Sequence, residues 1–173
     1  MTVETDVEGL LARVQLLEDE REVRRVIRRY GPSVDSGSSA AAAALWLDDG
    51  VYDMGKAPGG DELRLAPGRA ALTALFDGDF HQTLIAHGAA HVTSDCEVQI
   101  DGDTAVAYGY TFLFKATEDA AEFAVIRVMA TRFDFVRSSQ GWRIQRRSNR
   151  NLSGDEDARA LFRTAALSWS PAS

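Results

Sequence analysis

The chain has 173 residues, of which 45% are apolar and 26% are charged, and this is the size and composition of one globular domain with a sizeable core. Its formal net charge of -7 argues against a nucleic-acid-binding protein, which would present a basic face. The single cysteine, Cys96, excludes an intramolecular disulfide and a zinc site built on cysteines.

The N-terminal residues are acidic and lack the basic flank and the long apolar region of a secretory signal. The longest apolar run, residues 40–47, is too short to span a bilayer. We therefore expect a cytoplasmic protein that does not enter a membrane.

Residues 7–30 carry apolar side chains at spacings of three and four, which predicts an amphipathic helix. Gly31 and Pro32 should kink or end it, because proline lacks an N–H and clashes with the preceding turn. The spacing from Tyr30 to Val34 would nevertheless let the helix resume for one turn. Gly37 suits a left-handed cap after that turn. Asp35 then lies at the end of the helix, either solvated there or directed inward.

The next segments predict two more helices around a short strand. Ser38 or Ser39 can cap a second helix that runs to about Leu47. Residues 50–55 read as a short strand and residues 56–68 as a loop. Pro67 suits the first position of a third helix that Gly78 closes.

From residue 91 onward the pattern alternates, which predicts four antiparallel strands joined by short turns. They cover residues 91–100, 104–116, 121–137 and 142–152. The order of elements is that of an α+β domain, with a core of about residues 7–151 and a tail, 152–173, that could form a short helix. Both sheet faces carry apolar side chains, so we expect helices on one face and a second subunit on the other.

Alternation along the last strand separates its side chains into two sets. Trp142 and Ile144 would share one face with Arg146, Ser148 and Arg150, while Arg147 and Asn149 would lie on the other. We expect most of these arginines to be solvated or ion-paired. Asn149 and Arg132, on the preceding strand, are candidates to hold an oxyanion.

The histidine pair His87 and His91 raises the question of a metal site, because this spacing places two ligands together on a helix. On a straight strand, however, residues four apart are about 13 Å apart and could not share one ion. We therefore predict no metal site, with His87 lining the cavity further along and His81 at its mouth or surface. The sequence has no phosphate-binding loop and no serine nucleophile motif. Cofactor-free acid/base chemistry is thus the main enzymatic option.

The order of the elements and several motifs resemble the SnoaL-like group of the nuclear transport factor 2-like superfamily. The matching stretches are "EDEREVRRVIRRY", "VDSGSSAAAAALWLDDGVYD", "GRAALTALF", "HVTSDCEVQIDGDTAVAYGY" and "TRFDFVRSSQGWRIQRRS". This resemblance implies a cone-shaped barrel of three N-terminal helices packed on a curved, mostly antiparallel sheet. Such a fold hosts many functions, so it does not identify a reaction.

Within the superfamily, the pattern is similar to that of scytalone dehydratase and lindane dehydrochlorinase. The resemblance implies a catalytic dyad of Asp35 and His91, with Tyr30 and Tyr52 at the positions of catalytic tyrosines. Trp46 resembles a tryptophan of the lindane enzyme. Pro32 departs from the family pattern and could rotate Asp35 away. Without the resemblance, His91 reads as a strand histidine satisfied by hydrogen bonds.

Together these features predict a cofactor-independent lyase or isomerase, of dehydratase or polyketide-cyclase type, acting on a hydrophobic, cyclic small molecule. His91 would be the general base and Asp35 would orient it. The alternative is a non-catalytic ligand-binding protein or accessory subunit with the same cavity. A homodimer or higher homo-oligomer is expected in either case.

Overall fold

A computed structural model describes residues 3–57, 60–154 and 156–168 of the chain. Its helices are α1 (Val3–Asp35), α2 (Ser39–Ala43), α3 (Gly68–Asp77), α4 (Asp79–Ala86) and α5 (Glu156–Ser168). Its strands are β1 (Trp46–Lys56), β2 (Leu63–Pro67), β3 (Ala89–Thr93), β4 (Glu97–Asp101), β5 (Thr104–Ala116), β6 (Phe123–Ser138) and β7 (Gly141–Asn151). None of the described helices is long and apolar enough to cross a membrane.

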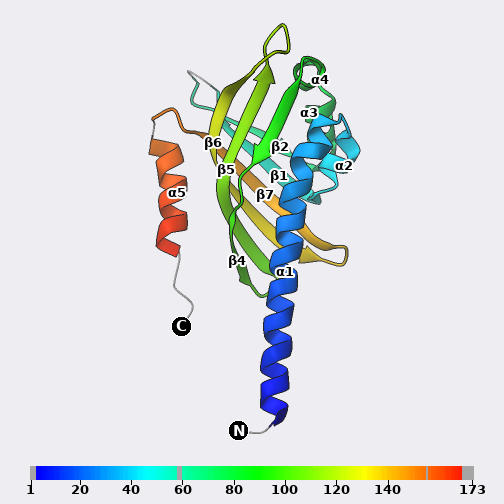
Figure 1. The fold of residues 1–173 in the computed structure, drawn as a ribbon, viewed down its shortest axis with the longest axis vertical. Coiled ribbons are helices and arrows are strands. Elements are labelled where there is room, and N and C mark those ends of the chain that lie inside the picture. Colours follow the sequence, from blue (N-terminus) through cyan, green and yellow to red (C-terminus); the bar gives the residue numbers. More distant parts are fainter. Residues whose placement is uncertain (1–2, 58–59, 155, 169–173) are drawn as a thin grey trace.

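The strands form one mixed sheet in the order β2-β1-β7-β6-β5-β3, with β4 also paired to β5. The β1–β7 pair is parallel and the other pairs are antiparallel. The sheet curves around α1 without closing, and α2, α3 and α4 gather at one end of it (Figure 1). This is the α+β cone that the sequence predicts.

The core lies between α1 and the inner face of the sheet. One side of α1 buries Val23, Ile27, Tyr30 and Val34. The sheet meets it with alternate side chains of its long strands, among them Ala105, Ala107, Phe133, Phe135, Trp142 and Ile144. Burial of these side chains supplies the main stabilisation of the cone.

Helix α1 does not end at Gly31 and Pro32 but continues through them to Asp35, the one further turn that the spacing from Tyr30 to Val34 allows. Pro32 lies on the exposed side of the helix, where the loss of one backbone hydrogen bond is tolerated. The helix ends where Gly37 adopts φ 69°, as predicted. The N–H of Ser38 donates to the Ser33 carbonyl at 3.0 Å and that of Gly37 to the Val34 carbonyl at 3.1 Å, which is a Schellman end.

Several other boundaries differ from the prediction. The short strand at 50–55 is the 11-residue β1, which begins at Trp46 and shortens α2 to end at Ala43. The expected loop contains β2, and α4 was not predicted. The strand at 91–100 is interrupted at Ser94, whose hydroxyl accepts the N–H of Tyr110 at 3.0 Å in place of a regular ladder bond. Two strands, β3 and β4, therefore share β5 as a partner.

The outer face of the sheet is covered in part by α5, the tail helix (Figure 1). The Phe162 ring packs against the Tyr110 ring at a centroid distance of 4.8 Å. Other apolar side chains of this face remain exposed, among them Val92 and Val128. Coverage by a second subunit stays a prediction.

Candidate functional site

Asp35 and His91 meet where the end of α1 crosses β3. One carboxylate oxygen of Asp35, Oδ2, accepts the backbone N–H of His91 at 2.8 Å. The other, Oδ1, lies 2.5 Å from the ring Nδ1 of His91. The two side chains are 22% and 12% exposed, so Pro32 does not turn the carboxylate out to solvent.

Gly31 is what allows α1 to lie this close to β3. A Cβ atom at position 31 would stand 2.2 Å from the carbonyl oxygen of His91, which is part of the backbone and cannot move aside alone. Any larger residue would push the helix off the strand and carry Asp35, one turn later, away from the ring. The "YGP" stretch therefore contains the feature that brings the carboxylate to the histidine.

The contact with Asp35 determines the tautomer of His91. A carboxylate is a hydrogen-bond acceptor, so Nδ1 carries the proton and Nε2 carries the lone pair. The imidazole ring lies 6.1 Å from the Tyr30 ring in a near-perpendicular arrangement and 5.8 Å from the His81 ring, both measured between centroids. Nε2 is therefore the nitrogen that can take a proton from a ligand.

His81 is a neighbour of the dyad that sequence reasoning placed at the mouth or surface. Its Nδ1 donates to the carbonyl of Phe76 at 2.9 Å, which leaves the lone pair on Nε2. Nε2 is buried and has no hydrogen-bond partner among the described residues. Burial, together with the nearby His91, lowers the pKa of His81 below its ordinary value. Its position next to His91 follows from α4, the short helix that carries it and that the sequence analysis did not predict.

Arg147 is a second residue that sequence reasoning did not single out. It is fully buried on β7, and its guanidinium carbon lies 3.8 Å from the centroid of the Tyr30 ring. Nη2 donates to the hydroxyl of Thr111 at 3.3 Å. Nε and Nη1 have no hydrogen-bond partner within the part of the chain that the structure describes. A buried cation with unused donors is costly unless something anionic or polar meets it.

A register shift near the start of β7 explains the position of Arg147. In the pairing with β6, Asp134 is opposite Arg146, but the next residue, Phe135, is opposite Ile144. Gln145 is therefore left out of the ladder. Arg147 and Asn149 are consequently buried with Trp142 and Ile144. Regular alternation had predicted that they lie on opposite faces.

Tyr52 and Asn149 belong to a buried chain of hydrogen bonds across the inner face. The amide nitrogen of Asn149 donates to the Tyr52 hydroxyl at 2.8 Å, and its oxygen accepts from Thr131 at 2.9 Å. The Thr131 hydroxyl, whose one hydrogen goes to Asn149, accepts in turn from the Thr111 hydroxyl at 2.9 Å, and Thr111 also accepts from Arg147. This network fixes the position of Arg147 and of the Tyr52 ring.

Aromatic rings form the remaining wall of the site. Trp46 is fully buried, and its ring lies 5.9 Å from Tyr30, 6.2 Å from Tyr52 and 6.1 Å from Phe76, measured between centroids. Burial raises the pKa of Tyr30 above its ordinary value, although the Arg147 guanidinium opposes this rise. Tyr30 is therefore a neutral hydroxyl donor at neutral pH.

Two predicted ligand-binding residues lie elsewhere. Arg132 is on the outer face of β6, where it donates to the Tyr108 hydroxyl and to Asp134. Alternation forces this, since its neighbours Thr131 and Phe133 point inward. His87 is exposed at the C-terminal end of α4, and its Nδ1 donates to the Thr83 carbonyl at 2.7 Å. Neither side chain reaches the dyad.

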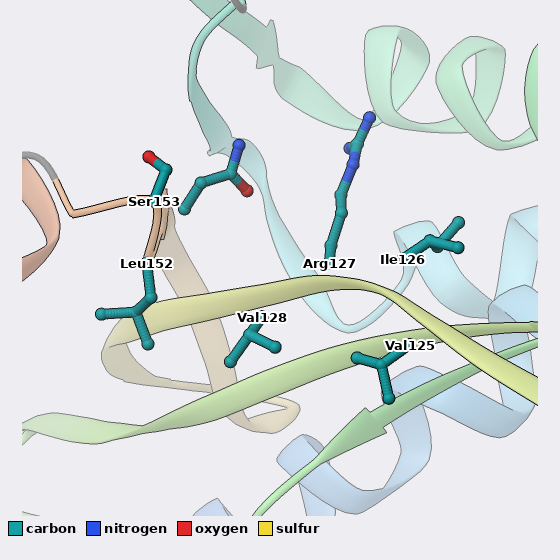
Figure 2. A pocket seen from close by; sticks show the side chains of 7 residues that line it. Val125, Ile126, Arg127, Val128, Leu152 and Ser153 are labelled. Carbon is teal, nitrogen blue, oxygen red and sulfur yellow. The ribbon is translucent and has the colours of Figure 1, made fainter.

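A surface pocket of about 400 Å³ opens between the first half of β6 and the end of β7 (Figure 2). Arg127, which lines it, extends away from Val125 and Val128 on the opposite side of the strand (Figure 2). In the sheet, Arg127 of β6 is opposite Leu113 of β5, and Leu113 is in turn opposite His91 of β3. The pocket therefore lies at the same end of the sheet as the dyad.

Among the described residues, no three His, Cys, Asp or Glu side chains converge to hold a metal ion.

Comparison with known families agrees with this architecture. The profile of the SnoaL-like domain matches residues 15–148, so the chain belongs to the SnoaL-like family. The cone is of the nuclear transport factor 2-like type. No curated protein matches the chain.

Solved structures share the fold. An NTF2-like protein with a cystatin-like fold from Novosphingobium aromaticivorans is 42% identical, with a TM-score of 0.82 over 89% of this chain and 95% of that chain. A single-residue variant of Rv3472 from Mycobacterium tuberculosis, a protein of unknown function, is 21% identical, with a TM-score of 0.67 over 90% of each chain. ActVI-ORFA from Streptomyces coelicolor is 19% identical, with a TM-score of 0.66 over 78% of this chain and 95% of that chain. The latter two likenesses concern the fold alone.

Proposed function

We propose that the protein is a cofactor-independent lyase or isomerase, of dehydratase or cyclase type, that acts on a hydrophobic, cyclic small molecule. The observation that carries the proposal is that two groups lie next to the Tyr30 ring: the carboxylate-bound imidazole of His91, and the buried guanidinium of Arg147 with donors that no described residue uses. The first is a general base and the second is a site for the negative charge that proton removal creates.

His91 is the base in this proposal. Its Nε2 takes a proton from the carbon next to a substrate carbonyl, and the electrons of the broken C–H bond pass to the carbonyl oxygen. Asp35 stabilises the imidazolium that forms and holds the ring in position. A base placed in this way contributes on the order of 10²–10⁴-fold in rate.

Arg147 and Tyr30 are the groups that receive the oxyanion. The Nε and Nη1 donors of Arg147, which no described residue engages, are already desolvated, so they gain a partner without losing water when the anion forms. Tyr30 adds a hydroxyl that remains protonated because burial raises its pKa. Tyr52 is held by Asn149 at 2.8 Å and contributes a hydroxyl of fixed position.

The imidazolium then gives up its proton, and the two reaction types differ in the group that receives it. In a dehydration, the proton goes to the departing hydroxyl as the C–O bond breaks, and water leaves. In a cyclisation, the enolate carbon attacks a second carbonyl and the new alkoxide takes the proton. His81, kept neutral by its lowered pKa, presents a second lone pair that accepts a hydrogen bond from a substrate hydroxyl.

Dehydration of 3-hydroxy-1-tetralone to 1-naphthol, followed by absorbance, tests this proposal with a bicyclic probe. We expect the wild-type protein to accelerate the reaction and His91→Ala to lose the acceleration while its circular dichroism spectrum is unchanged. A ligand-binding protein would bind 1-tetralone, measured by tryptophan fluorescence, without accelerating dehydration. Turnover that survives in His91→Ala would contradict the assigned base.

A further inference from the structure

The N-terminal half of α1 extends well beyond the sheet (Figure 1). Nothing in the described chain covers its large apolar side chains, which are between 43% and 64% exposed. They are Val7, Leu10, Leu11, Val14, Leu16 and Leu17. Six exposed apolar residues within eleven positions of one helix are more than scattered surface hydrophobicity.

Four of these residues repeat with the spacing of a coiled coil. Val7, Leu10, Val14 and Leu17 are separated by three, four and three residues, which places valine at the a positions and leucine at the d positions of two heptads. Leu11 adjoins the stripe, because it is one turn from Val7 and from Val14. A β-branched residue at a with leucine at d favours a two-stranded assembly.

The stripe points away from the domain that α1 belongs to. Val14 and the buried Val23 are nine residues apart, which at about 100° per residue puts them about 180° apart around the helix. The same count puts Val7 about 160° from Val23. Asp19, just after the stripe, faces the domain and binds Trp142 and Arg137. The side of α1 that carries the stripe is thus opposite the side that packs on the protein's own sheet, so this sheet does not cover the stripe.

We infer that this stripe, Val7 to Leu17, pairs with the same stripe of a second copy of the chain as a parallel two-stranded coiled coil. Charge selects both the partner and the direction. Arg13 immediately precedes Val14 and Glu18 immediately follows Leu17, so in a parallel pair each Arg13 faces the partner's Glu18. An antiparallel pair would bring Arg13 next to the partner's Arg13 instead.

The geometry of the domains permits this pairing. Because each stripe faces away from its own sheet, the two cones lie on opposite outer sides of the helix pair. The contact is short, two heptads, so we expect a dissociation constant on the order of micromolar. It is a different surface from the outer face of the sheet, and it does not depend on the proposed reaction.

Disulfide trapping of adjacent leucines tests the inference. In a parallel pair, Leu17→Cys places two thiols within disulfide distance across the seam, whereas Leu16→Cys directs them away from it. We expect the Leu17→Cys protein to cross-link under mild oxidation roughly tenfold or more faster than Leu16→Cys. Wild-type Cys96 does not compete, because burial raises the pKa of its thiol to about 11. A dimer formed through the sheet would not produce this difference.

Sedimentation velocity provides the second measurement. Leu17→Glu and an Arg13→Glu variant should lower the average mass at about 100 µM, while Leu16→Glu should not, and Arg13→Glu combined with Glu18→Arg should restore it. Equal cross-linking rates at positions 16 and 17 would overturn the inference. So would cross-linking between Val7→Cys and Leu17→Cys chains in preference to Leu17→Cys alone, which indicates an antiparallel pair. A wild-type chain whose mass does not differ from that of Leu17→Glu would also overturn it, and would mean that another kind of protein covers the stripe.

Discussion

The carboxylate of Asp35 holds His91 at two points, the backbone N–H through Oδ2 at 2.8 Å and the ring Nδ1 near Oδ1 at 2.5 Å. The first bond fixes the strand to the end of α1, and the second fixes the orientation and the tautomer of the ring. One residue thus joins the helix to the sheet and prepares the base. Loss of the carboxylate should affect both functions.

Asp35→Asn separates the electrostatic role of this residue from its packing. The amide has nearly the same shape but cannot stabilise an imidazolium as a carboxylate does. We expect dehydration of 3-hydroxy-1-tetralone to fall roughly 10²–10⁴-fold, with the circular dichroism spectrum retained. A turnover rate within a factor of about two of wild type would show that Asp35 only anchors the helix.

Gly31→Ala tests the close approach of α1 to β3. The added methyl group would overlap the carbonyl oxygen of His91, so we expect a loss of roughly 1–3 kcal/mol in the free energy of unfolding and a loss of turnover. Gly9→Ala is the matched control, because that glycine lies in the same helix with nothing of the described chain within 4 Å. It should be neutral or slightly stabilising, by up to about 1 kcal/mol. Equal unfolding midpoints in urea for the two variants would contradict the steric account.

Arg147→Met exchanges a buried cation for an apolar side chain of similar length. Since Nε and Nη1 lack partners among the described residues, removal of the charge should leave the unfolding midpoint unchanged or raise it. Turnover should nevertheless be lost, because the oxyanion loses its donors, by on the order of 10²–10³-fold. Arg132→Met, on the outer face, should leave turnover near wild type. If Arg147→Met unfolds the protein instead, the guanidinium is structural.

We expect Asp19 to account for part of the stability that the fold loses in acid. Hydrogen bonds from Arg137, together with one from Trp142, lower the pKa of Asp19 from 3.8 to about 2 against the opposing effect of burial. Because the folded pKa is the lower one, this stabilisation is complete above about pH 4 and is lost as the pH falls towards 2, a change of about 2 kcal/mol. In urea titrations, Asp19→Asn should be less stable at neutral pH and should lose less stability between pH 4 and pH 2.5.

Asp103→Asn is the control for this pH dependence. Asp103 also accepts from Arg137, but its side chain is 81% exposed. Its replacement should leave the acid limb of the stability curve almost unchanged. An identical acid limb in Asp19→Asn and wild type would contradict the assignment to Asp19.

The α+β architecture could be predicted because hydrophobic periodicity is visible in short stretches of sequence. The meeting of Asp35 with His91 could be predicted because both residues lie in short motifs that resemble the family's. Whether the helix would end at Pro32 or resume after it could not be decided from the sequence, since the sequence does not say which side of the helix faces solvent. The place of Arg147 depends on a shift in the pairing of β6 and β7, which involves residues far apart in the chain. The contact of His81 with the dyad depends on α4, which was not predicted because it is short, and Arg132 was placed on the wrong face because one residue of alternation decides the face.

Exchange of the C2 protons of 1-tetralone with deuterium from solvent tests proton abstraction by His91 directly. The reaction needs no leaving group, so it reports on the base alone and is read by proton NMR. We predict that wild-type protein accelerates the exchange at neutral pH, that Asp35→Asn retains only a fraction of this acceleration, and that His91→Ala exchanges at the buffer rate. Exchange by wild type no faster than by His91→Ala would contradict the account.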